Sequence, residues 1–185
     1  MEFPLCIFDL KSGILCPRCE EKVRKGLYDE LDIRIMRLLL ELEKELPKLS
    51  KTGFVKAVDG GDIVFIIMKE DSLKNIDQDT LHMIRKKLRE KLEKNVKIVE
   101  DDRSIPRFIE KLVAPARVVT INKIWLPDGS EEMRVILDRE RSLKTSVPSI
   151  IEVVKKVKGA ILRIDFEKSR WMERRMELSE KKAST

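Results

Sequence analysis

The apolar residues of positions 29–46 recur at steps of three and four, which is the period of a helix with one buried face. They are Leu31, Ile35, Leu38, Leu42 and Leu46. Pro47 ends the pattern, because proline cannot continue a helix. Two β-rich runs follow, at 53–58 and 63–68, and the Gly-Gly pair at 60–61 between them is typical of a hairpin turn.

A second amphipathic helix and a short strand complete this unit, at 81–92 and 96–99. The second half of the chain repeats the order. The repeat comprises a helix at 105–112, strands at 118–126 and 133–137 around a turn at 127–130, a helix at 150–157 and a strand at 160–166. We expect Ser149 to cap the second of these helices and Gly159 to end it.

The pattern therefore predicts an α+β fold with two tandem units, at 29–102 and 103–167, each ordered helix, two strands, helix, strand. A short segment that carries all three cysteines, residues 1–28, precedes them and shows neither a helical nor a strand period. A charged tail, residues 168–185, follows.

Composition narrows the class of protein. Of the 185 residues 42% are apolar, which is enough to close a core. The longest apolar run, at 63–68, is far shorter than the roughly 20 residues that a membrane helix needs. No apolar stretch of signal-peptide length opens the chain. We therefore predict a cytoplasmic protein without a membrane partner.

The net charge of +6 is unevenly distributed. Residues 1–100 hold 20 basic and 19 acidic side chains, whereas residues 101–185 hold 19 basic and 14 acidic ones. An excess of positive charge favours a polyanionic partner such as RNA, although a solvated, salt-bridged surface has the same composition. If RNA is bound, we expect it to contact residues after about 103.

One segment of the second unit resembles a known family. Residues 107–121, Arg-Phe-Ile-Glu-Lys-Leu-Val-Ala-Pro-Ala-Arg-Val-Val-Thr-Ile, are similar to the opening of a KH domain of the NusA type, in which a helix ending in Ala-Pro or Ser-Pro leads into the first strand. The predicted order of elements is that of the type II KH fold, and NusA proteins carry two such domains in tandem. With its cysteine-bearing head, the chain looks most like archaeal NusA-like transcription elongation factors. The resemblance implies two KH-like units, with RNA and proteins of the transcription machinery as partners.

The chain departs from the KH pattern at the loop that holds nucleic acid. A working KH domain clamps the nucleic-acid backbone with a GXXG loop, where glycine lets phosphates approach the main chain. The corresponding stretches here, 75–80 and 143–149, contain no glycine. The first carries Asp77 and Asp79 where phosphate would lie, so we expect that unit to be a scaffold or a protein-docking surface.

The second of these loops is compatible with phosphate, because its polar side chains precede a helix whose N–H groups point outward. The candidate nucleic-acid-binding residues are Lys144, Thr145, Ser146, Lys155 and Lys156. The alternative is that the lysines form the solvated face of that helix.

The three cysteines and one acidic residue form the pattern C-x2-D-x6-C-x2-C. Cys16 and Cys19 have the spacing of a zinc knuckle, in which two sulfurs reach one tetrahedral ion about 2.3 Å away. Cys6 is the remaining thiol, and Asp9 stands where a fourth cysteine would. We predict a structural zinc ion held by these four residues, because residues 1–28 have few apolar side chains with which to order themselves.

The sequence leaves other arrangements of this head open. The fourth ligand could come from His82, the one histidine of the chain, from water or from a second chain. The cysteines could also be free thiols or a redox pair of the thioredoxin type, which would require the C-x-x-C to open a helix beside a parallel strand.

Catalysis has little support in the sequence, which holds one histidine and no glycine-rich nucleotide motif or G-x-S-x-G motif. We predict a non-enzymatic protein without a small-molecule substrate: a transcription elongation or termination factor that contacts RNA, RNA polymerase or both. The alternative is a protein–protein docking module of the transcription or translation machinery, which would use the cysteine-bearing head and the Leu-rich helix. Trp125 is expected in the core, and Trp171 is the aromatic residue available to stack on a base or a partner.

Overall fold

The computed structural model describes residues 1–74, 76–126 and 131–167. The predicted turn at 127–130 and the charged tail at 168–185, with Trp171, lie outside the described residues. Within the part of the chain that is described, no helix is long and apolar enough to cross a membrane.

The first unit has the predicted order of elements. It comprises helix α3 (Glu30–Glu45), the short 3-10 helix η1 (Pro47–Lys51), strands β1 (Phe54–Asp59) and β2 (Ile63–Met68), helix α4 (Gln78–Leu92) and strand β3 (Asn95–Glu100). Strand β2 lies in the middle of the sheet, antiparallel to β1 and parallel to β3.

The second unit repeats this arrangement. It comprises helix α5 (Ile105–Val113), strands β4 (Val118–Trp125) and β5 (Glu131–Leu137), the 3-10 helix η2 (Glu140–Ser142), helix α6 (Val147–Lys158) and strand β6 (Ile161–Phe166). Strand β5 is antiparallel to β4 and parallel to β6. In both units the register shifts at the start of the first strand, between Phe54 and Lys56 and between Val118 and Thr120. The predicted α+β fold of two tandem units is therefore confirmed, and the repetition extends to this irregularity.

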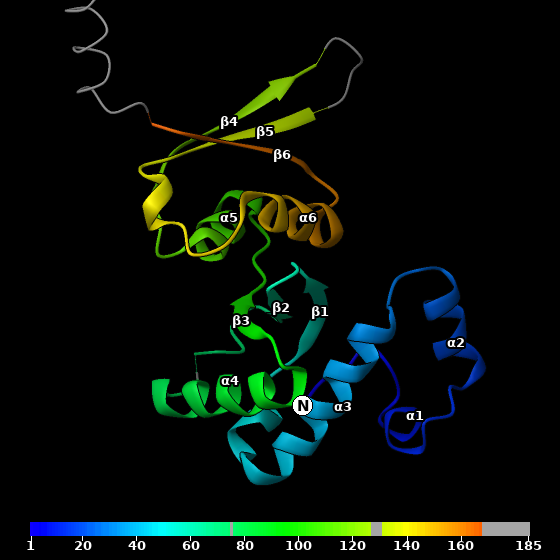
Figure 1. The fold of residues 1–185 in the computed structure, drawn as a ribbon. Coiled ribbons are helices and arrows are strands. Elements are labelled where there is room, and N and C mark those ends of the chain that lie inside the picture. Colours follow the sequence, from blue (N-terminus) through cyan, green and yellow to red (C-terminus); the bar gives the residue numbers. More distant parts are fainter. Residues whose placement is uncertain (75, 127–130, 168–185) are drawn as a thin grey trace, which may run out of the picture.

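The two units stack as four layers, seen from bottom to top in Figure 1. Helices α3 and α4 cover one face of the first sheet, and α5 and α6 lie between the two sheets. Alternation along β2 explains the stacking. Val64 and Ile66 belong to the core formed with α3 and α4, whereas Phe65 and Ile67 belong to the core shared with the second unit.

The head, residues 1–28, contains two short helices that its sequence pattern does not show. They are α1 (Ile7–Ser12) and α2 (Pro17–Arg24), and they lie beside α3 (Figure 1). Leu5 and Leu10 are buried in the core of the first unit. Glu2 bridges Gly53 just before β1, so the start of the chain is held against the first sheet. The head therefore shares its core with the first unit.

The apolar stripe of α3 is also turned into that core. Ile35, Met36 and Leu39 are fully buried, and Leu42 is nearly so. The Leu-rich face named above as a docking surface is thus occupied by the protein's own packing.

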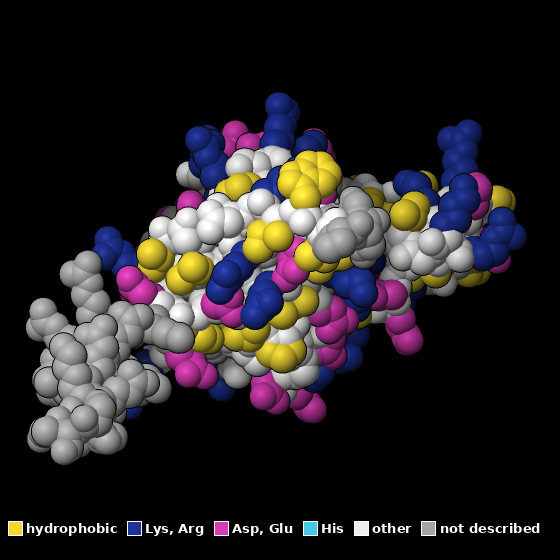
Figure 2. Space-filling model, turned by 90° about the horizontal axis from the view of Figure 1, so that it is seen from above, with side chains coloured by type: hydrophobic (Ala, Val, Ile, Leu, Met, Phe, Trp, Pro, Cys, Tyr) yellow, Lys and Arg dark blue, Asp and Glu magenta, His cyan; other side chains and the backbone are white. Residues whose placement is uncertain are grey.

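The outer face of the second sheet carries no covering layer among the described residues. Strand β6 alternates as predicted, with Leu162 buried and Arg163 exposed. Asp165 accepts from Arg134 at 2.6 Å and lies 3.6 Å from Arg163. Seen from above, hydrophobic, basic and acidic side chains are interspersed over this face (Figure 2). A mixed polar surface of this kind can face solvent, so this sheet can form the outermost layer of the protein.

Two predictions about the second unit are wrong. Trp125 is 67% exposed instead of buried, and its ring lies 4.8 Å from Lys123 Nζ. It is the last residue of β4, at the end where β4 rises away from α5 and α6 (Figure 1). Helix α6 is capped by Ser146, whose Oγ accepts from the Ser149 N–H at 3.4 Å. Ser149 lies inside the first turn, and Gly159 ends the helix in the left-handed conformation as predicted.

Ser149 instead joins the two units. Its hydroxyl donates to the Gly60 carbonyl at 2.8 Å, in the turn between β1 and β2. A Cβ on Gly60 would lie 2.8 Å from the Ser149 Cβ and 2.9 Å from the Phe65 ring. The turn of the first unit therefore fits against the start of α6 only because residue 60 has no side chain.

Replacing Gly60 by alanine is expected to lower the free energy of unfolding by about 1–3 kcal/mol, as overpacking of a fitted contact does. The change should also speed hydrogen exchange in the first turn of α6, measured by mass spectrometry. Asp62→Ala, an exposed position of the same turn, is the control and should change stability by about 0.5 kcal/mol or less. Equal effects of the two substitutions would refute the close fit.

Candidate metal centre and nucleic-acid residues

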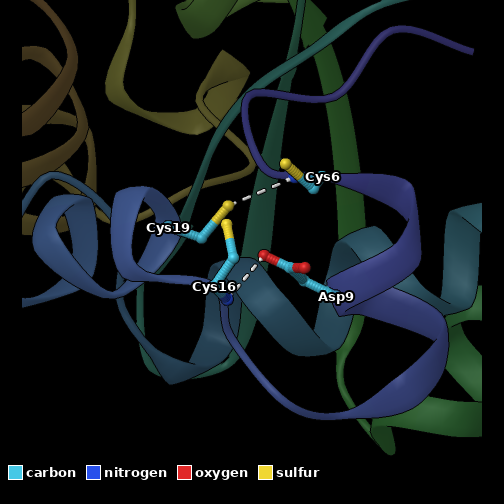
Figure 3. Close-up of side chains that lie close together, drawn as sticks. All are labelled: Cys6, Asp9, Cys16 and Cys19. Atoms are coloured by element: carbon cyan, nitrogen blue, oxygen red, sulfur yellow. Dashed lines mark hydrogen bonds between the residues drawn. The ribbon is translucent and has the colours of Figure 1, made fainter.

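Four side chains of the head converge on one point. One ligand atom from each of Cys6, Asp9, Cys16 and Cys19 lies within 4.8 Å of the other three. The close-up shows the side chains directed toward one another, with Cys6 and Asp9 on one side and the two remaining cysteines on the other (Figure 3). The chain thus brings together all four residues that the spacing predicts.

The two short helices explain how four residues so close in sequence can converge. Cys6 is the N-cap of α1 and Asp9 lies in its first turn. Cys16 is the N-cap of α2 and Cys19 lies in its first turn. In each pair the side chains at the N-cap and three residues later share one end of the helix. Gly13 ends α1 with a φ of 82°, a left-handed conformation that lets the chain turn back toward α2.

Backbone groups hold the ligands in place. The Cys6 N–H donates to Cys19 Sγ at 3.3 Å, and the Cys16 N–H donates to the Asp9 carboxylate at 3.0 Å (Figure 3). Each bond crosses from one half of the cluster to the other. Lys22 on α2 donates to the Pro4 carbonyl at 2.7 Å and closes the head further. The cluster is therefore oriented by its own main chain before any ion is considered.

The protonation states of the cluster follow from burial. Burial raises the pKa of the Cys19 thiol to about 12. Hydrogen bonds from the Cys19 thiol and from the Cys16 N–H lower the pKa of Asp9, which is itself buried. Without a cation the cluster therefore combines an ionised carboxylate with a protonated Cys19 thiol. A divalent cation that binds thiolates here must displace protons.

The donor set fits a tetrahedral metal ion. Ligands about 2.3 Å from a tetrahedral centre lie about 3.8 Å from one another, so the cluster needs only a small contraction to close around zinc. Three sulfurs and one carboxylate oxygen are donors that zinc accepts. His82 is exposed on α4 and is not part of the close group, so among the described residues Asp9 is the one that completes the set of three cysteines. These four residues could hold a metal ion.

The five candidate nucleic-acid residues have different surroundings in the structure. Thr145 is buried, and Ser146 is used to cap α6. Lys156 pairs with Glu152 at 2.9 Å, so its charge is largely compensated. Lys144 and Lys155 are exposed, but they lie near opposite ends of α6, separated by roughly 15 Å along the helix. They do not form one compact pocket.

Two cations of the first unit, Lys97 and Arg85, were not predicted, and Lys97 is affected by the charges of both Arg85 and Lys144. Lys97, in the middle of β3, donates to the carbonyls of Leu112 and Ala114 at 2.6 and 2.7 Å and so closes the end of α5. Burial, together with the charges of Arg85 and Lys144, lowers the pKa of Lys97 to about 8. The sequence signal that could have identified Lys97 is a charged residue in the middle of a short, largely apolar strand.

Comparison with known proteins bears on the fold alone. No family model matches the chain, and no curated protein matches it. A solved structure described as the crystal structure of APE1850 is similar, with a TM-score of 0.51 and 16% sequence identity. The similarity covers 71% of this chain and 96% of that one. At this level of identity it supports the arrangement of helices and strands and carries no function.

Proposed function

We propose that the protein is a non-enzymatic factor of the transcription machinery, acting in the cytoplasm, that contacts RNA through its tandem KH-like units. In this proposal Cys6, Asp9, Cys16 and Cys19 hold a structural zinc ion. The observation that carries the proposal is the repeated unit: the same element order, strand pairing and register shift occur twice. Type II KH units are expected to have this order, and a tandem pair suits an extended single strand.

Three cations provide the phosphate contacts of the proposed surface. Lys144 precedes α6, Lys155 lies further along that helix, and Arg85 lies on α4 of the first unit. The charges of Lys144 and Arg85 both act on Lys97. Among the described residues none of the three forms an ion pair, in contrast to Lys156. A phosphate can therefore approach them without displacing a carboxylate.

The proposed surface differs from a KH clamp in how the loop before α6 is used. A GXXG loop holds the nucleic-acid backbone with its own main chain. Here Ser146 caps the helix and Ser149 bonds to Gly60, so this loop binds the first unit. Side-chain cations rather than main-chain groups must then provide the affinity, and binding should tolerate many sequences.

Binding of a single-stranded RNA oligonucleotide, followed by fluorescence anisotropy, tests this proposal. Three phosphate contacts predict a salt slope of about −2, so a fourfold rise in salt should weaken binding roughly 20-fold. Charge reversal at Lys144 or Lys155 should each weaken binding and reduce the slope by about 0.7.

The control for these variants is Lys74→Glu, which changes the net charge equally at an exposed lysine that already pairs with Asp71. Its affinity for the RNA should stay within about twofold of the unmodified protein. If Lys144→Glu and Lys155→Glu bind as well as this control, the second unit is not the RNA surface.

A further inference from the structure

A cleft opens between the head and α3, away from the residues assigned above. It has a volume of about 560 Å³ and is lined by the end of α1 and by one side of α3. The cations at its wall are Lys11, Arg37 and Lys44, and Glu41 is the one anion. The lining thus carries an excess of two positive charges, although the first hundred residues are almost neutral overall.

These cations have no partner among the described residues. Lys11, Arg37 and Lys44 are all exposed, and none makes an ion pair or a hydrogen bond through its charged group within the described part of the chain. Nearby charges behave differently: Lys25 pairs with Glu21, and Glu45 pairs with Lys87. The cleft therefore concentrates positive charge that no carboxylate of the described residues neutralises through an ion pair.

The geometry suits an extended anion better than a small one. Arg37 and Lys44 lie two turns apart on α3, about 10 Å along its axis, and Lys11 faces them from α1. Such a row can contact successive groups of a polyanion. Ser12 and Gly13 at the end of α1 complete the wall with small groups.

Exposed apolar side chains stand beside these cations. Phe8 is 78% exposed and lies one helical turn before Lys11, so their Cβ atoms are about 5–6 Å apart. Ile14, directly after Gly13, is 76% exposed. Proteins that bind single-stranded nucleic acid combine a positive groove for phosphates with an aromatic side chain on which a base stacks. An acidic peptide would also use the cations. The flat ring of Phe8 favours RNA, because a base can stack on it.

We propose that this cleft is a second binding site for single-stranded RNA. Backbone phosphates lie along Lys11, Arg37 and Lys44, and a base stacks on Phe8. The site belongs to the head and the first unit and goes beyond the function proposed above, which assigns RNA contacts to Lys144 and Lys155. The head and the second unit then offer two positive surfaces on one chain.

Anisotropy with a single-stranded RNA oligonucleotide of mixed sequence tests the site. The double variant Lys11→Glu, Lys44→Glu should weaken binding tenfold or more and reduce the salt slope by about 1.4. Phe8→Ala should weaken binding about tenfold through lost stacking, whereas Phe8→Tyr should bind as the unmodified protein does. Glu41→Gln should tighten binding about twofold, because it removes the anion from the cleft.

Two controls make the result specific. Lys25→Glu alters charge on the same head at a paired, exposed lysine and should leave affinity within about twofold. The second control separates the cleft from the metal centre: Arg37→Glu, on α3 and outside the cysteine cluster, should weaken RNA binding while the metal content stays unchanged. Circular dichroism of every variant excludes unfolding as the cause.

The outcomes separate this site from the proposed function. If the cleft variants bind RNA normally while Lys144→Glu weakens binding, the cleft proposal is overturned and the second-unit surface stands. If only the cleft variants weaken binding, the cleft is supported and the assignment to Lys144 and Lys155 fails. If polyglutamate displaces the RNA and Phe8→Ala has no effect, the occupant is an acidic protein segment and the RNA proposal for the cleft is overturned.

Discussion

If the head holds zinc as proposed, replacing Cys19 by serine should release that ion and lower the stability of the protein. Cys19 is buried, and its sulfur already accepts the Cys6 N–H, so it lies at the centre of the cluster. At a free zinc concentration of about 1,000 times the dissociation constant, binding adds about 4 kcal/mol to the free energy of unfolding. Cys19→Ser should lose that contribution. The measurements are zinc content by mass spectrometry and urea unfolding with and without a chelator.

The same experiment tests the fourth ligand. Asp9→Ala should lose zinc or bind it far more weakly, because the described cluster offers no other carboxylate or imidazole. Glu20→Gln, which removes a carboxylate next to Cys19 but outside the cluster, should keep one zinc ion per chain. Full zinc content in Asp9→Ala would show that water or another chain completes the site. No zinc in the unmodified protein would refute the zinc proposal.

Asp32→Ala is expected to be the most damaging substitution outside the head. Asp32 lies fully buried at the start of α3, where it accepts from the Ala57 N–H at 2.6 Å and from Lys56 Nζ at 2.7 Å. It also accepts from the Asp29 N–H at 2.9 Å. Its removal leaves the Lys56 charge and two N–H donors without their acceptor, which costs about 3–5 kcal/mol. The midpoint of urea unfolding should fall accordingly.

The loss of stability in Asp32→Ala should also affect the head. Lys56 Nζ also donates to the Leu27 carbonyl at 2.6 Å, so the Asp32–Lys56 pair joins the end of the head to β1. Asp32→Asn keeps the shape and one acceptor, and it should cost less than the alanine variant. Asp29→Ala removes only the cap of α3, for which about 1 kcal/mol is typical. A loss of 1 kcal/mol or less in Asp32→Ala would contradict the role given to this carboxylate.

The helices and strands of both units could be predicted because each has one buried face, which spaces its apolar residues regularly along the sequence. The helix that begins near Leu31, the hairpin around residues 60–61 and the alternation of β6 each follow from a period that one buried face imposes. The repeated order of elements could be seen in the sequence for the same reason. The structure adds the shared strand pairing and the matching register shifts. The four candidate metal ligands do lie close together, as knuckle spacing around one tetrahedral ion predicts.

Other features depend on contacts between distant segments. Trp125 was expected in the core, yet it is largely exposed at the end of β4 that rises away from α5 and α6. Ser149 looked like a helix cap, but its hydroxyl donates to Gly60, a residue far away in sequence. The two head helices are too short to show a period and are held by Leu5 and Leu10 in the core of the first unit.

The sequence alone determined the two α+β units, their order and the group of four residues that could hold a metal ion, because each depends on residue types at short, fixed spacings. The tertiary structure decided which faces are buried, which hydroxyls already make hydrogen bonds within the protein and which cations lie near one another. Lys11 faces Arg37 and Lys44 across a cleft only after the head folds onto α3. The charge of Lys144 acts on Lys97 only after the second unit stacks on the first. Electrostatic surfaces depend on distances in space, and a count of charges along the chain holds no such distances.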